Sequence, residues 1–331
     1  MTPTLRKLRK LFRTPGLYWR DYFLKRYPLE ETPRTRSRTV AKSRSRRSSY
    51  VQAKAYEGPP LDCGVTFGIT LASSRSVADW ERTVALLRGT LCSVIQQSSP
   101  AWRVIIAGHE MPELPEIEHP QVEFLSINAF RPTHPSKFRA DKARKRHAIG
   151  QRLRQLGGGL LMQLDADDLV ANDLVSECLR ISHPHGYILT KGYVYDWQSH
   201  NLAPVPGVWP LDLDRVCGSC AVVRYDEEDL PSANTEVRDP DVVFNMTRQH
   251  AYIRVVCEEL QRPLLSLEQP MVVYVVNHGG SLSFQMQKKR SRGANIIESV
   301  EKYKLAESSA QEILARFGMK DAFITTDKVF S

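Results

Sequence analysis

Hydrophobic positions follow two alternating patterns from residue 62 onward. Short apolar runs rich in β-branched residues predict strands, and apolar residues at helical spacing predict helices between them. The predicted strands are residues 65–71, 102–107, 122–127, 160–164, 187–195, 220–225 and 271–276. The predicted helices are residues 77–97, 138–156, 174–181, 242–260 and 296–317. This alternation predicts an α/β fold with a mostly parallel central sheet flanked by helices.

The first sixty residues follow a different pattern. Residues 1–27 place leucines and aromatic residues at roughly helical spacing between Arg and Lys, with a break at Pro15-Gly16, which predicts two short amphipathic helices. Such helices bind anionic membrane surfaces, and packing on the main domain or on a partner is the alternative. We therefore interpret residues 1–30 as a basic amphipathic helical arm. Residues 31–61 are rich in Ser and Arg and poor in apolar residues, which predicts a linker.

The charge of the chain is divided unevenly. Residues 1–50 carry fifteen Lys and Arg and three acidic residues, so this segment holds +12 of a total of +9 and leaves −3 for the rest. A mildly acidic body is not typical of a nucleic-acid-binding domain, so no nucleic-acid partner is expected. The basic start lacks the apolar core of a secretory signal, and no apolar run suits a spanning helix. We expect a cytoplasmic protein, peripheral on the inner face of the membrane.

The sequence Asp165-Ala166-Asp167-Asp168 directly follows the predicted strand 160–164. Side chains two residues apart at a strand end point the same way, and two close carboxylates repel unless a cation lies between them. Mn²⁺ and Mg²⁺ prefer oxygen ligands, and ligands of such sheets bind beyond the carboxyl ends of the strands. The alternative is a surface turn in which Asp167 or Asp168 caps the next helix. The position after a strand favours a divalent metal site.

Several segments share features with one enzyme family. Ile69-Thr70-Leu71 looks like the first strand of its nucleotide fold, residues 91–97 and 102–106 match a Ser-x-x-x-Gln … Trp-x-x-x-Ile passage, and residues 164–168 match its metal motif. Residues 62–287 are accordingly interpreted as one domain that resembles the GT-A glycosyltransferases, nearest to the family 2-like enzymes of bacterial capsule or lipopolysaccharide biosynthesis. Residues 288–331 are interpreted as a C-terminal helical tail. The resemblance implies a GT-A fold and transfer of a sugar from a nucleotide-sugar donor to a saccharide or lipid-linked acceptor.

The resemblance also implies site residues. Asp165 and Asp167 would hold Mn²⁺ or Mg²⁺ against the donor's diphosphate, and His278, after the strand 271–276, looks like the third ligand. Thr70 would contact the donor. The second strand ends in Ala107-Gly108-His109-Glu110, where the family has an acidic residue that reads the nucleoside base, so the sequence departs from the pattern there.

A basic helix precedes the metal strand. Lys142, Lys145 and Arg146 offer a positive face, and we expect Lys142 and Arg146 to bind the diphosphate, with a solvated helix face as the alternative. An inverting reaction needs a base that takes the acceptor's proton, whereas a retaining one does not. The candidates for this base, which the sequence leaves open, are His250, Glu228, Asp229, Asp239 and Asp241.

Two rival functions remain at this point. A nucleotidyltransferase that makes sugar nucleotides needs a Gly-rich basic loop after the first strand, and residues 71–76 contain no Gly. A non-catalytic, membrane-associated scaffold of a polysaccharide assembly complex would tolerate loss of the aspartates, yet the cluster is intact.

Overall fold

The computed structural model describes residues 49–58, 64–207, 212–239, 241–280 and 292–319. The amphipathic helices expected within residues 1–27 lie outside these described residues, as does most of the expected linker. No helix in the described part of the chain is both long enough and apolar enough to cross a bilayer.

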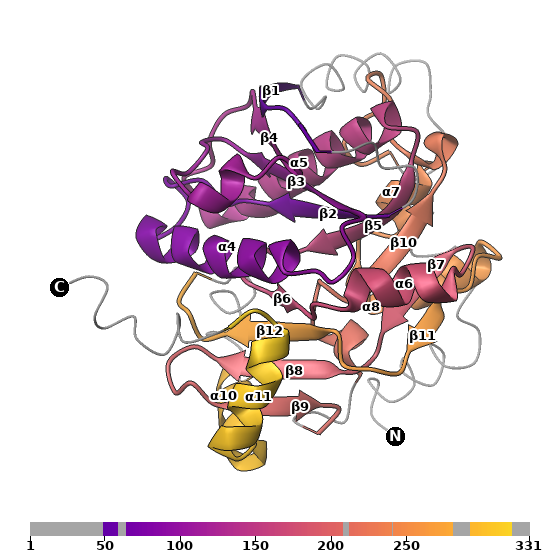
Figure 1. Cartoon of the computed structure of the whole chain (residues 1–331). Helices are drawn as coiled ribbons and strands as arrows, with labels where there is room; N and C mark the ends of the chain where they lie inside the picture. The colour runs from indigo at the N-terminus through magenta and orange to yellow at the C-terminus, as the bar shows by residue number, and fades with distance from the viewer. Residues whose placement is uncertain (1–48, 59–63, 208–211, 240, 281–291, 320–331) are drawn as a thin grey trace, which may run out of the picture.

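The larger of two sheets has the strand order β1-β4-β3-β2-β5-β10-β7-β11 (Figure 1). Its central strands β4, β3, β2 and β5 are parallel, while β1 and β10 run antiparallel to their neighbours. The fold is therefore α/β as predicted, and the larger sheet is mixed, with four parallel and three antiparallel pairings among the strands that the structure describes. The bounds are β1 Tyr50–Lys54, β2 Val65–Thr70, β3 Trp102–Gly108, β4 Val122–Ile127, β5 Gly159–Leu164, β7 Gly186–Leu189, β10 Ala221–Tyr225 and β11 Leu265–Leu267.

A smaller sheet has the order β6-β12-β8-β9. Its strands are β6 Leu169–Val170, β8 Gly192–Asp196, β9 Leu202–Val205 and β12 Val272–Val276. The single strand expected over residues 187–195 is thus two strands, β7 and β8, which belong to different sheets. Gly192, the first residue of β8, lets this strand approach β12 closely. A Cβ at this position would lie 2.7 Å from the Val272 carbonyl oxygen.

The helices agree with the apolar periodicity, except that two are divided. The expected helix 242–260 forms α7 and α8, and the expected helix 296–317 forms α10 and α11. The bounds are α4 Trp80–Ile95, α5 Pro135–Gln155, α6 Leu174–Ile181, α7 Val243–Met246, α8 His250–Glu259, α10 Arg292–Tyr303 and α11 Glu307–Arg316, with short 3-10 turns η1 Pro115–Glu118, η2 Leu213–Arg215 and η3 Glu227–Asp229.

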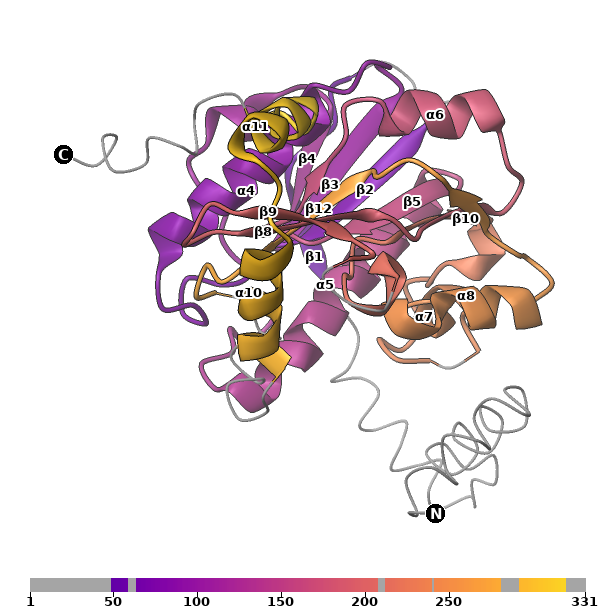
Figure 2. The same cartoon turned by 90° about the horizontal axis from the view of Figure 1, so that it is seen from below.

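Helices cover both faces of the larger sheet (Figures 1 and 2). Val104 and Ile106 of β3 pack into a core shared with α4, α6 and the smaller sheet. Ile105 and Ala107 of the same strand face the opposite core, which α5, α7 and α8 close. This two-sided burial explains why the central strands are continuous apolar runs.

The described segments extend the main domain at both ends. Residues 50–54, expected within the linker 31–61, form the edge strand β1, which pairs with β4. The expected boundary at residue 62 is therefore too late. Val300 of α10 and Phe317, just after α11, are fully buried in the core beside the smaller sheet. The helices of the expected tail 288–331 thus pack as part of the domain.

Candidate metal centre

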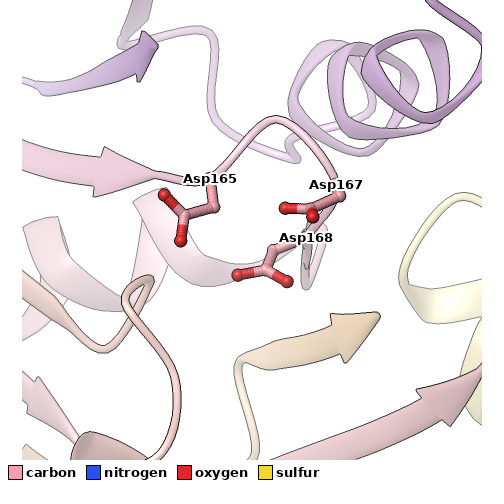
Figure 3. A group of neighbouring side chains, drawn as sticks. All are labelled: Asp165, Asp167 and Asp168. Atoms are coloured by element: carbon pink, nitrogen blue, oxygen red, sulfur yellow. The ribbon is translucent and has the colours of Figure 1, made fainter. Parts of the chain in front are cut away.

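The three aspartates lie in the turn that carries the chain from β5 of the larger sheet to β6 of the smaller one. Figure 3 shows their carboxylates gathered on the inner side of this turn. Each offers an oxygen, and these oxygens lie within 4.8 Å of one another. Asp165 and Asp167 line a cavity, whereas Asp168 is fully buried. The turn therefore presents two carboxylates to the cavity and keeps the third in the protein interior.

Asp168 anchors the turn. Its Oδ2 accepts hydrogen bonds from Ser219 Oγ at 2.6 Å and Cys217 Sγ at 3.3 Å, and its Oδ1 accepts one from the Val275 backbone N–H at 3.2 Å. Burial, followed by the charge of Asp167, raises the pKa of Asp168 well above its usual value. These bonds tie the turn to β12 and to the loop before β10, so Asp168 is not an exposed helix cap.

Asp165 is held from two sides. Its backbone N–H donates to Ser219 Oγ at 2.9 Å, and its Oδ1 lies 2.6 Å from Lys142 Nζ. Gly218 packs so closely that a Cβ there would lie 2.7 Å from Asp165 Oδ2. Burial acts to raise the pKa of Asp165, but the charges of Lys142 and Arg146 outweigh burial and lower the pKa. The carboxylate is therefore ionised and beside the Lys142 ammonium, a contact that was not predicted from the sequence.

His278 approaches the cluster from the end of β12. Its Nε2 lies 2.8 Å from Asp167 Oδ2, and the ring is almost fully buried. The contact lacks the alignment of a hydrogen bond, so Nε2 is a buried polar atom without a hydrogen-bond partner. Arg82 of α4 donates to the His278 carbonyl oxygen at 3.2 Å and holds this loop in place.

These residues fit a divalent cation. Two carboxylates and one imidazole nitrogen, converging on one cavity wall, are a ligand set suited to Mn²⁺ or Mg²⁺. An unbonded buried Nε2 costs free energy that coordination of an ion would recover. Asp165, Asp167 and His278, the three residues predicted as ligands, line one cavity, with His278 against Asp167, while the oxygens that lie within 4.8 Å of one another are those of Asp165, Asp167 and Asp168.

The cavity extends from the cluster to the end of β2. Thr70 and Lys142 line it, at the positions expected for donor contacts. Arg146 does not line it; its Nη1 donates to the Arg248 carbonyl oxygen at 2.8 Å, while its charge acts on Asp165. The predicted role of Arg146 is therefore limited to its electrostatic effect on the cluster.

Of the candidate bases, His250 is near the cluster. It is the first residue of α8, and its charge and that of Asp165 influence each other's pKa. Burial lowers the pKa of His250, with Asp165 opposing the shift. Because this pKa is lowered, the His250 imidazole is neutral and can accept a proton.

The structure contradicts the assignment of Asp229 as a base. Strand β10 runs antiparallel to β5, with Tyr225 opposite Gly159, so Glu228 and Asp229 follow at the end of β5 remote from Asp165. Asp229 also forms an ion pair with Arg262 and caps its own 3-10 turn. Asp229 is therefore a structural residue, and Glu228 is an exposed residue of the same turn.

Asp241 is likewise unsupported as a base. Its side chain is exposed, and its backbone N–H donates to Asp239 Oδ1 at 3.1 Å. Asp239 acts on the pKa of His147, in the middle of α5. Neither aspartate lines the cavity.

A buried charge cluster that the sequence reading missed lies in the same cavity. His109 Nε2 is 2.8 Å from Asp141 Oδ1, and Lys145 Nζ is 2.5 Å from Asp141 Oδ2. Lys145, expected on an exposed basic face, is only 2% exposed. Burial lowers the pKa of Lys145, with Asp141 opposing. The i, i+4 spacing of Asp141 and Lys145 was the available signal.

Glu110 does not face the ligand space freely either. It accepts hydrogen bonds from Ser73 Oγ at 3.2 Å and from the Ser74 backbone N–H, and so fixes the loop after β2. It therefore holds a loop at the position where the sequence resemblance placed a base-reading acid.

Comparison with known proteins adds no identity to these observations. No protein-family model matches the chain, and no curated protein matches it. The functional conclusion accordingly depends on the geometry of the site.

Proposed function

We propose that this protein is a metal-dependent glycosyltransferase of the GT-A type. It would move a sugar from a nucleotide-sugar donor to a saccharide or lipid-linked acceptor in bacterial surface polysaccharide biosynthesis. The observation that carries the proposal is the convergence of Asp165, Asp167, His278 and Lys142 on one cavity at the carboxyl ends of the strands. Ligands of open α/β sheets bind at such an edge.

The chain's own residues divide the work of binding. Asp165 and Asp167, with His278, would hold Mn²⁺ or Mg²⁺, which when bound supplies Lewis-acid stabilisation of a diphosphate leaving group. Lys142, kept at the cavity wall by Asp165, would donate to the anionic diphosphate. Asp168 and Ser219 would keep both cavity-facing carboxylates in position.

His250 is the candidate base for an inverting reaction. A base must be neutral before it accepts the acceptor's hydroxyl proton, and the lowered pKa of His250 favours that state. His250 does not line the donor cavity. The acceptor would therefore reach His250 from the side that faces away from the donor.

The proposed location is the inner face of the cytoplasmic membrane. The basic amphipathic pattern of residues 1–30 supports contact with an anionic lipid surface, where a lipid-linked acceptor is available. In cosedimentation with vesicles of anionic phospholipid, the full chain should appear in the vesicle pellet. A chain without residues 1–30 should stay in the supernatant. Equal retention of both would remove the arm from the proposal.

Turnover with a panel of sugar nucleotides tests the function. With Mn²⁺ present, the full chain should hydrolyse at least one sugar nucleotide or transfer the sugar from it. EDTA should abolish this activity, and the Asp167→Asn variant should lack it. Asp226→Asn is the matched control, because Asp226 is an exposed aspartate outside the cavity.

The rival functions give different results in the same assay. A nucleotidyltransferase would form a sugar nucleotide from a nucleoside triphosphate and a sugar phosphate. A scaffold would turn over no donor. Either result, or full activity in Asp167→Asn, would overturn the proposed transferase.

A further inference from the structure

Helix α5 places a buried ion pair in the cavity wall that metal binding leaves unexplained. Asp141 is 4% exposed and Lys145 2% exposed, and both line the cavity. Among the charged residues of the lining, Lys142, Asp165 and Asp167 belong to the aspartate cluster, which leaves this pair. Its two charges must therefore be explained separately.

Stability alone is a weak explanation for such a pair. Removing two charges from water costs about as much free energy as their attraction returns, so an apolar pair would pack as well. In ligand cavities, by contrast, a few polar groups among apolar ones fix the orientation of the ligand. The neighbouring lining is apolar, with Val77, Leu86 and Phe138.

The position of the pair suits one part of a nucleotide sugar. Asp141 is held by His109, which follows β3, while Asp165 follows β5. Strands β5, β2 and β3 are successive neighbours, so the strand ends that precede Asp165 and His109 lie about 10 Å apart at the usual strand spacing. A ribose and its phosphates separate a base from a metal-bound diphosphate by a span of this order.

The chemistry of the pair matches the edge of a nucleobase. The Lys145 ammonium can only donate hydrogen bonds, and the ionised Asp141 carboxylate can only accept them. A ligand of this pair must therefore present a hydrogen-bond acceptor to Lys145 and, beside it, a donor to Asp141. Base edges offer this combination, and their flat rings suit the apolar wall at Phe138. The His109 contact keeps the Asp141 carboxylate in one orientation.

We propose that Asp141 and Lys145 recognise the base of the donor's nucleoside and so determine which nucleotide the site accepts. This inference rests on the proposed function, because it assumes a diphosphate at the aspartate cluster. The Asp141 carboxylate and the Lys145 ammonium of helix α5 would then contact the base. Glu110 would not supply this contact, because it is hydrogen-bonded to the loop after β2.

Calorimetric titration of the full chain with Mn²⁺ present tests the proposal. The ligands are UDP, GDP, CDP and ADP, the base-free ribose 5-diphosphate, and inorganic pyrophosphate. We expect one nucleotide to bind at least about 100-fold more tightly than ribose 5-diphosphate. Lys145→Met should reduce that ratio about 10- to 100-fold, as for a lost hydrogen bond to a charged group, and leave pyrophosphate affinity unchanged.

Two further variants make the result decisive. Asp141→Asn/Lys145→Met removes both buried charges together, so it should fold even if Lys145→Met leaves Asp141 unpaired and unfolds. Lys137→Met, an exposed lysine on the first turn of the same helix, should keep the wild-type ratio.

The outcomes separate this inference from the proposed function. If the wild type binds pyrophosphate but does not prefer nucleotides to ribose 5-diphosphate, or if the folded double variant keeps the ratio, the inference is overturned alone. If the wild type binds no diphosphate with Mn²⁺, the proposed function is overturned and the inference with it.

Discussion

His278 Nε2 lies 2.8 Å from Asp167 Oδ2, and no hydrogen bond joins the two groups. His278 lies just after β12 and Asp167 lies in the turn after β5, more than one hundred residues apart in the chain. A buried nitrogen without a hydrogen-bond partner costs free energy unless another group satisfies it. A divalent cation would do so.

Replacing His278 with Ala should weaken Mn²⁺ binding. Loss of an outer-shell partner of a metal costs about 10- to 100-fold in affinity, and loss of a ligand should cost at least as much. Mn²⁺ titration followed by electron paramagnetic resonance of the free ion measures the effect. His185→Ala, a histidine before β7 and outside the cavity, serves as the control. Unchanged affinity in His278→Ala would exclude it as a ligand.

Gly218→Ala should damage the same site by steric pressure. The added Cβ would lie 2.7 Å from Asp165 Oδ2, so the carboxylate must move. We expect about tenfold weaker Mn²⁺ binding, with a loss of about 1–3 kcal/mol in the free energy of unfolding. Gly157→Ala is a useful comparison, because it introduces backbone strain at φ +85° without a close contact. It should lower stability and leave Mn²⁺ affinity intact; equal effects of both variants on affinity would contradict the steric argument.

His250 and Asp229 should separate catalysis from stability. His250→Ala should lower the turnover number of an inverting transfer about 10²- to 10⁴-fold, as expected for loss of a general base. Asp229→Asn should leave turnover unchanged and lower the free energy of unfolding by about 1–2 kcal/mol, because it weakens the ion pair with Arg262. Steady-state kinetics and urea unfolding measure the two effects. The reverse pattern would restore Asp229 as the base.

His147 should make the protein sensitive to acid. Burial lowers the pKa of this α5 histidine from 6.5 to about 4, so the unfolded chain takes up a proton that the folded chain refuses. Stability is therefore kept above pH 6.5 and lost as the pH falls toward 4, by about 3 kcal/mol in total. Urea unfolding of wild type and His147→Leu from pH 7.5 to 4 isolates this contribution as their difference. A difference independent of pH would refute it.

Much of the fold could be predicted because the relevant information is local. Each strand from β2 to β5 is a short apolar run, and α4, α5 and α6 repeat apolar residues at helical spacing. The aspartates could be placed at a strand end for the same reason. Strand β1, which is short and exposed at Val51, carries a weaker pattern and was missed.

Other features depend on pairing between distant segments. Periodicity does not reveal that residues 187–195 change sheets, nor that β10 runs antiparallel to β5. That direction puts Ser219 beside Asp165 and carries Asp229 to the opposite end of the strand.

Local sequence patterns were sufficient to predict most of the elements and the Asp165–Asp168 turn, because backbone preferences and apolar spacing act over a few residues. The groups that surround that turn come from segments distant in the chain, so they depend on the folded arrangement. It buried Asp168 against Ser219, brought His278 to Asp167, and placed Lys145 inside the cavity. Strand direction and helix packing are fixed by long-range burial of apolar faces, which no local pattern encodes.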